Sequence, residues 1–223
     1  GSEMCIRDRY RIDVGQNDKA HVMAQIIRAE GHERVMAFCN TKGMTERLKA
    51  FLMMEGLEAD CIHGDIRQSQ REKTMQRYRD GKLAVLIATD VASRGIDVDD
   101  VDCVINYDVP EENEYYVHRI GRTGRAGKQG TAITFVSPSE FRGLNNLMRD
   151  IKVEIKRETL PSPQDIVEMK RLKIKDEMQE IVENESYDGY REFAEELLAE
   201  YTPDVALGAL LRLAFRSELD QSN

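Results

Sequence analysis

The chain has 223 residues, of which 41% are hydrophobic and 33% charged, and a formal net charge of −9. This composition excludes an intrinsically disordered chain, and no apolar run approaches the ~20 residues that a membrane-spanning helix needs. The length fits one large domain, or one domain of ordinary size with an appendage.

The negative charge is concentrated near the carboxyl end. From Pro161 onward, 15 Asp and Glu residues stand against 7 Lys and Arg, so the preceding residues are close to neutral. A basic surface can therefore exist in the first part of the chain without appearing in the total.

The first elements along the chain predict an α/β domain. The polar, charged start GSEMCIRDR predicts no signal peptide, and we expect residues 1–9 to be a linker, with Gly1-Ser2 left over from expression. Short β-rich apolar runs then alternate with polar stretches of helical spacing, which predicts a parallel sheet with helices on both faces over residues 10–158. The apolar runs are 34–39, 59–63, 83–89, 102–107 and 131–136, and the helical stretches include 44–56, 68–81 and 112–122.

The pattern changes after LPSP at 160–163, beyond which no strand-like run follows. We expect three helical segments, at about 164–184, 187–200 and 204–219. Thr202-Pro203-Asp204 would open the last one, because proline is tolerated early in a helix. A domain boundary near 158–162 and a small all-α domain over 162–223 follow.

Four cysteines, Cys5, Cys39, Cys61 and Cys103, form no CxxC pair and have no histidine at metal-ligand spacing. Three of them lie in apolar runs, which is typical of buried, reduced thiols. We therefore expect no metal site and a cytoplasmic location.

The stretch HRIGRTGRAG at 118–127 alternates arginine with glycine. Each glycine costs a helix interior about 1 kcal/mol relative to alanine, so we expect a helix end or loop that allows a ligand to approach the backbone closely. The arginine fork matches phosphate oxygens and keeps its charge, which favours the arginine-finger role in phosphoryl transfer. A solvated basic loop is the alternative, but it does not explain the glycine spacing.

Two further stretches follow predicted strands, where parallel sheets place their ligands. In ATDVASRGIDV at 88–98, a hydroxyl, an arginine and amides freed by Gly95 suit phosphate contacts, and Asp97 suits a ribose hydroxyl. A capped strand-to-helix turn is an equal alternative. In CIHGDIRQSQREK at 61–73, Gln68 and Arg71 share one helix face, and a locally bonded turn histidine is favoured over a catalytic base at His63.

Together with FCNTK at 38–42, these stretches resemble the second RecA-like domain of the DEAD-box ATP-dependent RNA helicases over roughly residues 10–158. The spelling HRIGRTGR is highly specific to that family. The resemblance implies that Arg122 and Arg125 reach the γ-phosphate of ATP, with Arg125 the stronger finger, and that Gly95 and Asp97 lie beside its ribose.

The same resemblance implies contacts with the backbone of single-stranded RNA from Thr41, Gly64, Gln68, Arg71 and Thr89. It also implies coupling to a partner domain through Arg94, His118 and Arg119. Such contacts read phosphates and 2′-hydroxyls rather than base identity.

The sequence lacks three motifs that complete DEAD-box helicases carry. We find no GxxxxGK[ST] loop to cradle phosphates, no DEAD tetrapeptide to hold Mg²⁺ and no SAT motif. ATP and Mg²⁺ are then expected to bind mainly to a first RecA-like domain, and the chain alone is expected to show no ATPase. A DNA-directed superfamily 2 helicase, against which the HRIG spelling argues, and a non-catalytic assembly module are the alternatives.

The last segment, VALGALLRLAF at 205–215, has apolar residues spread over more than one helical stripe. About 60 residues form only a marginal core, and the layout resembles the helical dimerisation region of bacterial DEAD-box proteins of the cold-shock and ribosome-assembly type. We predict a homodimer, with a helical cap docked on the RecA-like domain as the alternative. The acidic exterior would repel RNA. The predicted dimer interface comprises Val205, Leu207, Leu210, Leu211 and Phe215.

Overall fold

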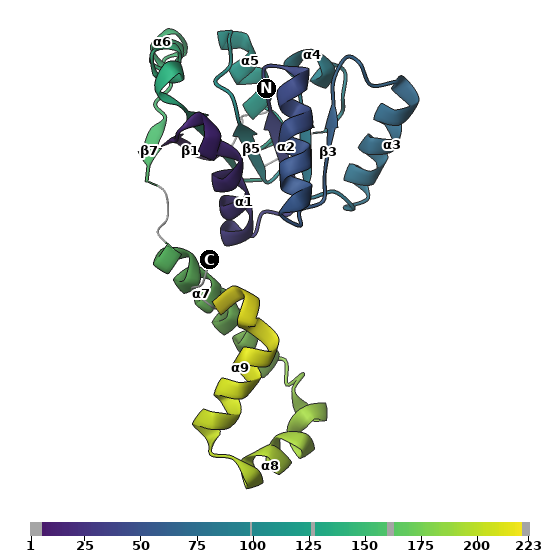
Figure 1. The fold of residues 1–223 in the computed structure, drawn as a ribbon, viewed down its shortest axis with the longest axis vertical. Helices are drawn as coiled ribbons and strands as arrows, with labels where there is room; N and C mark the ends of the chain where they lie inside the picture. The colour runs from purple at the N-terminus through teal and green to yellow at the C-terminus, as the bar shows by residue number, and fades with distance from the viewer. Residues whose placement is uncertain (1–5, 99, 126–127, 160–162, 220–223) are drawn as a thin grey trace. The chain divides into compact units, whose positions relative to one another are not determined.

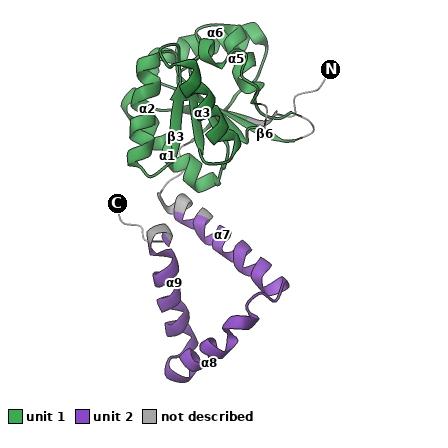
Figure 2. Cartoon of the chain, turned by 90° about the vertical axis from the view of Figure 1, so that its right-hand side faces the viewer, with its two compact units in different colours: residues 1–160 green, residues 161–223 purple. Residues whose placement is uncertain are grey.

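The computed structural model of the chain describes residues 6–98, 100–125, 128–159 and 163–219. The chain divides into two compact units, residues 1–160 and 161–223 (Figure 2). The sequence-based boundary lay near 158–162, and each unit is described by itself below.

The first unit is built on a seven-stranded sheet in the order β3-β4-β2-β5-β6-β1-β7, and each strand pairs in parallel with its neighbours (Figure 1). The five predicted strands are confirmed. The strands are β1 Ile6–Asp13, β2 Val35–Phe38, β3 Ala59–Ile62, β4 Val85–Ala88, β5 Cys103–Asn106, β6 Gly130–Val136 and β7 Lys156–Glu158.

Helices cover both faces of this sheet. Successive strand residues point to opposite faces, so Ala37 packs in the cluster that includes Leu48 of α2, while Phe38 packs in the cluster that includes Tyr78 of α3. All residues of β2 to β5 are buried, as expected for strands covered on both sides. One face carries α1 Lys19–Glu30 and α2 Lys42–Met54; the other carries α3 Gln68–Arg79, α5 Asn113–Ile120 and α6 Phe141–Ile151. The predicted α/β fold class is thereby confirmed.

One expectation about this unit is wrong. Residues 1–9 were expected to be a linker, but β1 begins at Ile6, and Tyr10 pairs with Ile133 on one side and Lys156 on the other. The sequence IRDRYRID has five charged residues among eight and no apolar run. The edge strand β7, with sequence KRE, is exposed throughout and was not predicted either.

The second unit contains only helices among its described residues, and all three predicted segments are confirmed. Pro203 begins the last helix, and the amide of Ala206 donates to the carbonyl of Thr202 at 2.9 Å. Among the side chains that the structure describes in this unit, only Val167 and Ala206 are buried. No helix within the described residues is long and apolar enough to cross a membrane. The helices are α7 Pro163–Glu183, η3 Asp188–Tyr190, α8 Arg191–Glu200 and α9 Pro203–Leu219.

Candidate functional site

Three turns lie side by side where adjacent strands end. Thr41 follows β2, Gly64 follows β3 and Thr89 follows β4, which is the strand between the other two. The Cys39 amide donates to the Ala88 carbonyl at 3.0 Å, so β2 and β4 stay paired to their ends. The structure thus brings three of the predicted RNA-contacting positions to one edge of the sheet.

Local hydrogen bonds hold these turns in shape. The Thr41 hydroxyl accepts from the Met44 amide at 3.2 Å and caps α2, and the Thr89 hydroxyl accepts from the Ala92 amide at 3.4 Å and caps the short helix α4 Asp90–Ser93. Such caps contribute about 1 kcal/mol each. Both threonines therefore have a structural role in the geometry of their turns.

The two predicted groove residues on α3 differ in their surroundings. Arg71 is half-buried, and its Nη2 donates to the Ala92 carbonyl at 2.8 Å, which ties α3 to α4. Gln68 is exposed, and its Nε2 donates to Glu72 at 3.3 Å. Arg71 is thus held in place by the fold, whereas Gln68 presents a solvent-facing amide.

Arg119 is 1% exposed, and from the interior of the domain it contacts the turns that contain Asn40 and Asp90. Its Nε and Nη2 donate to the two carboxylate oxygens of Asp90, each at 2.6 Å, and its Nη2 also donates to Asn40 Oδ1 at 2.8 Å. Its Nη1 donates to the Asp108 carbonyl at 2.9 Å, and its guanidinium lies 5.3 Å from the Phe38 ring centroid. A bidentate, charge-assisted pair of this kind is strong and directional. These partners all belong to the first unit, so Arg119 positions the Asn40 and Asp90 turns within the domain.

A buried charge network extends from this arginine across the sheet edge. Asp108 Oδ2 accepts from the Asn40 amide at 2.8 Å, and its other oxygen lies 3.7 Å from the fully buried ammonium of Lys19. Lys19 also donates to Glu140, whose second oxygen accepts from the Val109 amide at 2.8 Å. Burial opposes ionisation of Glu140, but the hydrogen bond from Lys19 and those from backbone amides leave its pKa lowered. No sequence motif indicates this network, because it joins isolated residues that lie far apart in the chain.

Of the predicted ATP-contacting residues, the structure brings Arg122 and the Gly95 segment together. Arg122 donates to the carbonyls of Ser93, at 2.9 Å, and Ile96, so its side chain lies against the segment that contains Gly95. Gly95 has φ +76°, a left-handed conformation that L side chains rarely adopt. Arg125 is exposed, and its Nε donates back to the Gly121 carbonyl; Asp97 is exposed as well.

The predicted coupling residues His118 and Arg94 are exposed. The Arg94 guanidinium lies 6.0 Å from the ring centroid of Tyr115 on α5. α5 ends at Ile120 and Gly124 adopts φ +69°, as the glycine spacing predicted for a helix end and loop, while Gly127 lies outside the described residues. Of the three predicted coupling residues, Arg119 alone is buried.

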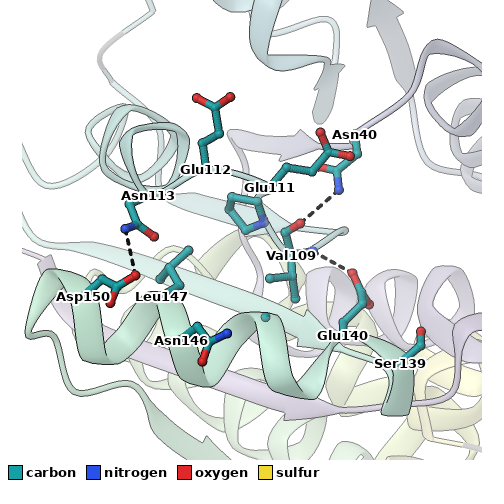
Figure 3. Close-up of a pocket in the computed structure, with 12 residues that line it drawn as sticks. Asn40, Val109, Glu111, Glu112, Asn113, Ser139, Glu140, Asn146, Leu147 and Asp150 are labelled. Carbon is teal, nitrogen blue, oxygen red and sulfur yellow. Dashed lines mark hydrogen bonds between the residues drawn. The ribbon is translucent and has the colours of Figure 1, made fainter.

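A pocket of about 580 Å³ opens beside this site, between α5 and α6 (Figure 3). Asn40 donates to the Val109 carbonyl at 3.0 Å, and Asn113 donates to Asp150 at 3.3 Å across the pocket. Glu111 and Glu112 add exposed carboxylates, which would repel phosphate groups. None of the predicted ATP or RNA residues lines it, so this pocket is distinct from the predicted nucleotide site.

The predicted dimer face of α9 is exposed in the single chain. Val205 is 53% exposed and Leu213, outside the predicted set, is 83% exposed, whereas Phe215 is partly buried at a break in the helix.

The prediction of buried, reduced cysteines is confirmed for Cys39, Cys61 and Cys103, and Cys5 lies outside the described residues.

Two family models match the chain. The helicase conserved C-terminal domain matches residues 18–127, and the RNA helicase DeaD dimerization domain matches residues 161–221. The DEAD-box ATP-dependent RNA helicase CshA of Bacillus cereus is 37% identical over 192 residues, covering 86% of this chain and 37% of that protein. The chain thus spans less than half the length of this curated relative.

Solved structures agree with these matches. A DEAD box protein from Methanococcus jannaschii is 42% identical with a TM-score of 0.65, over 69% of this chain and 42% of that one. The C-terminal domain of the DEAD-box protein Dbp5 is 31% identical with a TM-score of 0.66, over 76% of this chain and 98% of that one. The chain belongs to the DEAD-box family of RNA helicases and comprises its carboxyl-terminal RecA-like domain, followed by the region that the DeaD dimerization-domain model matches.

Proposed function

We propose that this chain is the carboxyl-side part of an ATP-dependent RNA helicase. In this proposal it supplies arginine fingers to ATP and half of a single-stranded RNA groove, and its second unit forms a homodimer. The observation that carries the proposal is the shared support of both sites: Arg119 binds the Asn40 and Asp90 turns and belongs to the same motif as Arg122 and Arg125.

The arginines would act on the phosphate charge. Arg122 and Arg125 would stabilise the negative charge that develops on the γ-phosphate, while Gly95 and Asp97 would lie beside the ribose. Bound Mg²⁺-ATP supplies the phosphoryl group and is held mainly by the partner RecA-like domain. Arg122 already lies against the segment around Gly95, which favours its role as the positioned member of the pair.

The three turns would form the RNA side of the cleft. Thr41, Gly64 and Thr89, with Gln68 and Arg71 on α3, would contact phosphates and 2′-hydroxyls of one strand, so that RNA is distinguished from DNA without reading bases. Closure of the two RecA-like domains on ATP and RNA would bend that strand and separate a short duplex, and hydrolysis would reopen the cleft. Work in the cytoplasm, on cold-shock or ribosome-assembly RNAs, is the setting that the resemblance favours.

Replacement of the proposed finger tests the enzymatic role. In the complete enzyme, Arg125→Ala should lower kcat for RNA-stimulated ATP hydrolysis by about 10³-fold or more, because the transition-state charge loses its stabilising cation. Lys128→Ala is the matched control, since it removes another exposed cation, paired with Asp100, three residues after Arg125. Equal activity of Arg125→Ala and Lys128→Ala would exclude the finger role.

Two comparisons separate this function from the alternatives. Single-stranded RNA should stimulate the complete enzyme and DNA of the same sequence should not; the reverse result would indicate a DNA-directed helicase. The isolated chain should not hydrolyse ATP, and an RNA-stimulated ATPase that persists through purification would contradict the expected division between two domains.

A further inference from the structure

A cluster of three different metal-ligating side chains lies between α2 and β3. Cys61 belongs to β3, His63 follows it in the next turn, and Glu46 belongs to α2. One donor atom of each, the Cys61 sulfur, an imidazole nitrogen of His63 and a carboxylate oxygen of Glu46, lies within 4.8 Å of the other two. The sequence predicted no metal site, because it contains no CxxC pair and the spacing Cys61-x-His63 becomes informative only once α2 packs beside it.

We propose that Glu46, Cys61 and His63 form a binding site for a zinc-class divalent cation. A thiolate, an imidazole and a carboxylate are the ligand types that zinc accepts, and three protein ligands with a fourth position for water are typical of open zinc sites. Magnesium and calcium prefer sites made of oxygen ligands alone. The proposed ion is therefore distinct from the Mg²⁺ that accompanies ATP.

The fold holds the three ligands in a preorganised arrangement. Cys61 and His63 are two residues apart and are both buried, and His63 Nε2 lies 2.8 Å from Glu46 Oε1. The Cys61 thiol is within hydrogen-bonding reach of Glu46 and of the Thr45 hydroxyl. The Glu46 side chain is 53% exposed, so an ion can enter from its side. Short ligand movements, rather than a backbone rearrangement, are then sufficient to surround an ion.

The two neighbouring lysines form their closest ion pairs with carboxylates other than Glu46. Lys49 lies 2.9 Å from Asp60, and Lys42 lies 2.6 Å from Asp65, so each cation has a carboxylate partner of its own. Glu46 remains available to balance the charge of a divalent cation.

Binding must remove one proton from each of two ligand atoms, Cys61 Sγ and His63 Nε2. The Asp65 amide donates to His63 Nδ1 at 3.2 Å, so the ring proton sits on Nε2; coordination through Nε2 moves that proton to Nδ1 and breaks this bond. Cysteine binds metal ions as the thiolate, so the Cys61 thiol proton leaves to solvent as the ion binds. The net change is one proton released for each ion bound.

A bound ion would join two of the turns discussed above. Thr41 caps the start of α2, which carries Glu46, and Gly64 directly follows His63. The ion would therefore fix the distance between the β2–α2 and β3–α3 turns. An effect of the bound ion on RNA binding rests on the proposed function, whereas the metal site itself does not depend on it.

The test uses the whole chain, stripped with a chelator and titrated in the absence of ATP and RNA. Zn²⁺ alone should bind at one equivalent and should not be displaced by excess Mg²⁺. Co²⁺, used as a spectroscopic substitute, should give thiolate-to-metal charge-transfer absorption in the near ultraviolet. Because neither nucleotide nor RNA is present, the outcome is independent of helicase activity.

Two variants and one control make the assignment specific. Cys61→Ser should remove the charge-transfer absorption, and Glu46→Gln should weaken Zn²⁺ binding by about 10-fold or more, with the fold intact because Glu46 is exposed. Cys103→Ser, which alters a thiol just as buried on β5, should change neither. The proposal is overturned if the chain binds no stoichiometric Zn²⁺, if the Co²⁺ complex lacks thiolate absorption, or if Glu46→Gln binds like the unaltered chain.

Discussion

Neighbouring residues of one motif have opposite environments in this domain. Arg119 is buried against Asp90 and Asn40, whereas His118, one position earlier on the same helix, is exposed. The motif predicted a cluster of positive charge but not which arginine points inward. That distinction depends on how α5 is rotated against the sheet, which only packing determines.

Removal of the buried charge should therefore destabilise the domain. Arg119→Met leaves the Asp90 carboxylate without its guanidinium partner, and we expect a loss of about 3–5 kcal/mol in the free energy of unfolding. Arg94→Met, which removes an exposed arginine nearby, should change it by less than about 0.5 kcal/mol. Urea denaturation of residues 1–160, followed by circular dichroism, measures both. Similar values for the two variants would show that Arg119 has no organising role.

At the scale of elements, Lys19 and Glu140 connect the start of α1 to the segment after β6. Lys19 is the first residue of α1, and Glu140 ends the 3-10 turn η2 Pro138–Glu140 that precedes α6. Glu140 also accepts from the Ser137 amide at 3.1 Å, closing a capping box. Because Glu140 also accepts from the Val109 amide after β5, one carboxylate joins three segments that lie far apart in the sequence.

The lowered pKa of Glu140 gives this connection a defined pH dependence. A carboxyl group whose folded-state pKa is depressed stabilises the fold above its unfolded pKa, about 4.3, and loses that contribution as the pH falls through the lower folded value. Glu140→Gln should therefore cost about 1–3 kcal/mol at pH 7 and progressively less as the pH falls below about 4.

Urea denaturation at pH 7 and at a pH below about 4 measures the loss in the free energy of unfolding that Glu140→Gln causes at each pH. Glu111→Gln is the control, because Glu111 lines the same pocket but is exposed. A penalty for Glu140→Gln that is the same at neutral and acidic pH would contradict the assigned role.

The sequence predicted the interior elements well and the edge of the sheet poorly. Strands β2 to β6 were recognised because burial on both faces requires continuous apolar runs. β7 is an edge strand and β1 is its neighbour, and both are rich in charged residues, so neither shows an apolar run in the sequence. The motifs predicted roles for Thr41, Thr89 and Arg122, but the contacts around them could not be predicted, because pairs such as Lys19 with Glu140 depend on the tertiary fold.

At the scale of the whole molecule, the second unit leaves most of its apolar surface uncovered. Large apolar patches exposed on several helices are typical of an interaction surface. A second copy of the same chain is the partner that we propose, related by a two-fold axis. The exposed side chains include Leu172, Met178, Ile181, Val182, Phe193, Leu198, Leu207, Leu210, Leu211 and Leu213.

Solution mass tests this dimer directly. Sedimentation of the whole chain should give about twice the mass of one chain, and residues 1–160 should be monomeric. Leu210→Glu should shift the whole chain toward monomer by placing a charge in the apolar face. Met54→Glu, at an exposed apolar residue of the first unit, should leave the mass unchanged. A monomeric whole chain at high micromolar concentration would favour the docked cap instead.

The position of β1 has a consequence for biosynthesis. β1 precedes every other strand in this chain, yet it lies between β6 and β7, and Arg11 pairs with both Thr134 and Arg157. During translation, β1 cannot form its native pairing with β6 and β7 until nearly the whole first unit has left the ribosome. Such long-range pairing delays folding. In the nascent chain, β1 therefore remains without its native neighbours until they have been synthesised. The charged residues of IRDRYRID, which leave the strand without an apolar run, also disfavour its premature association with other strands.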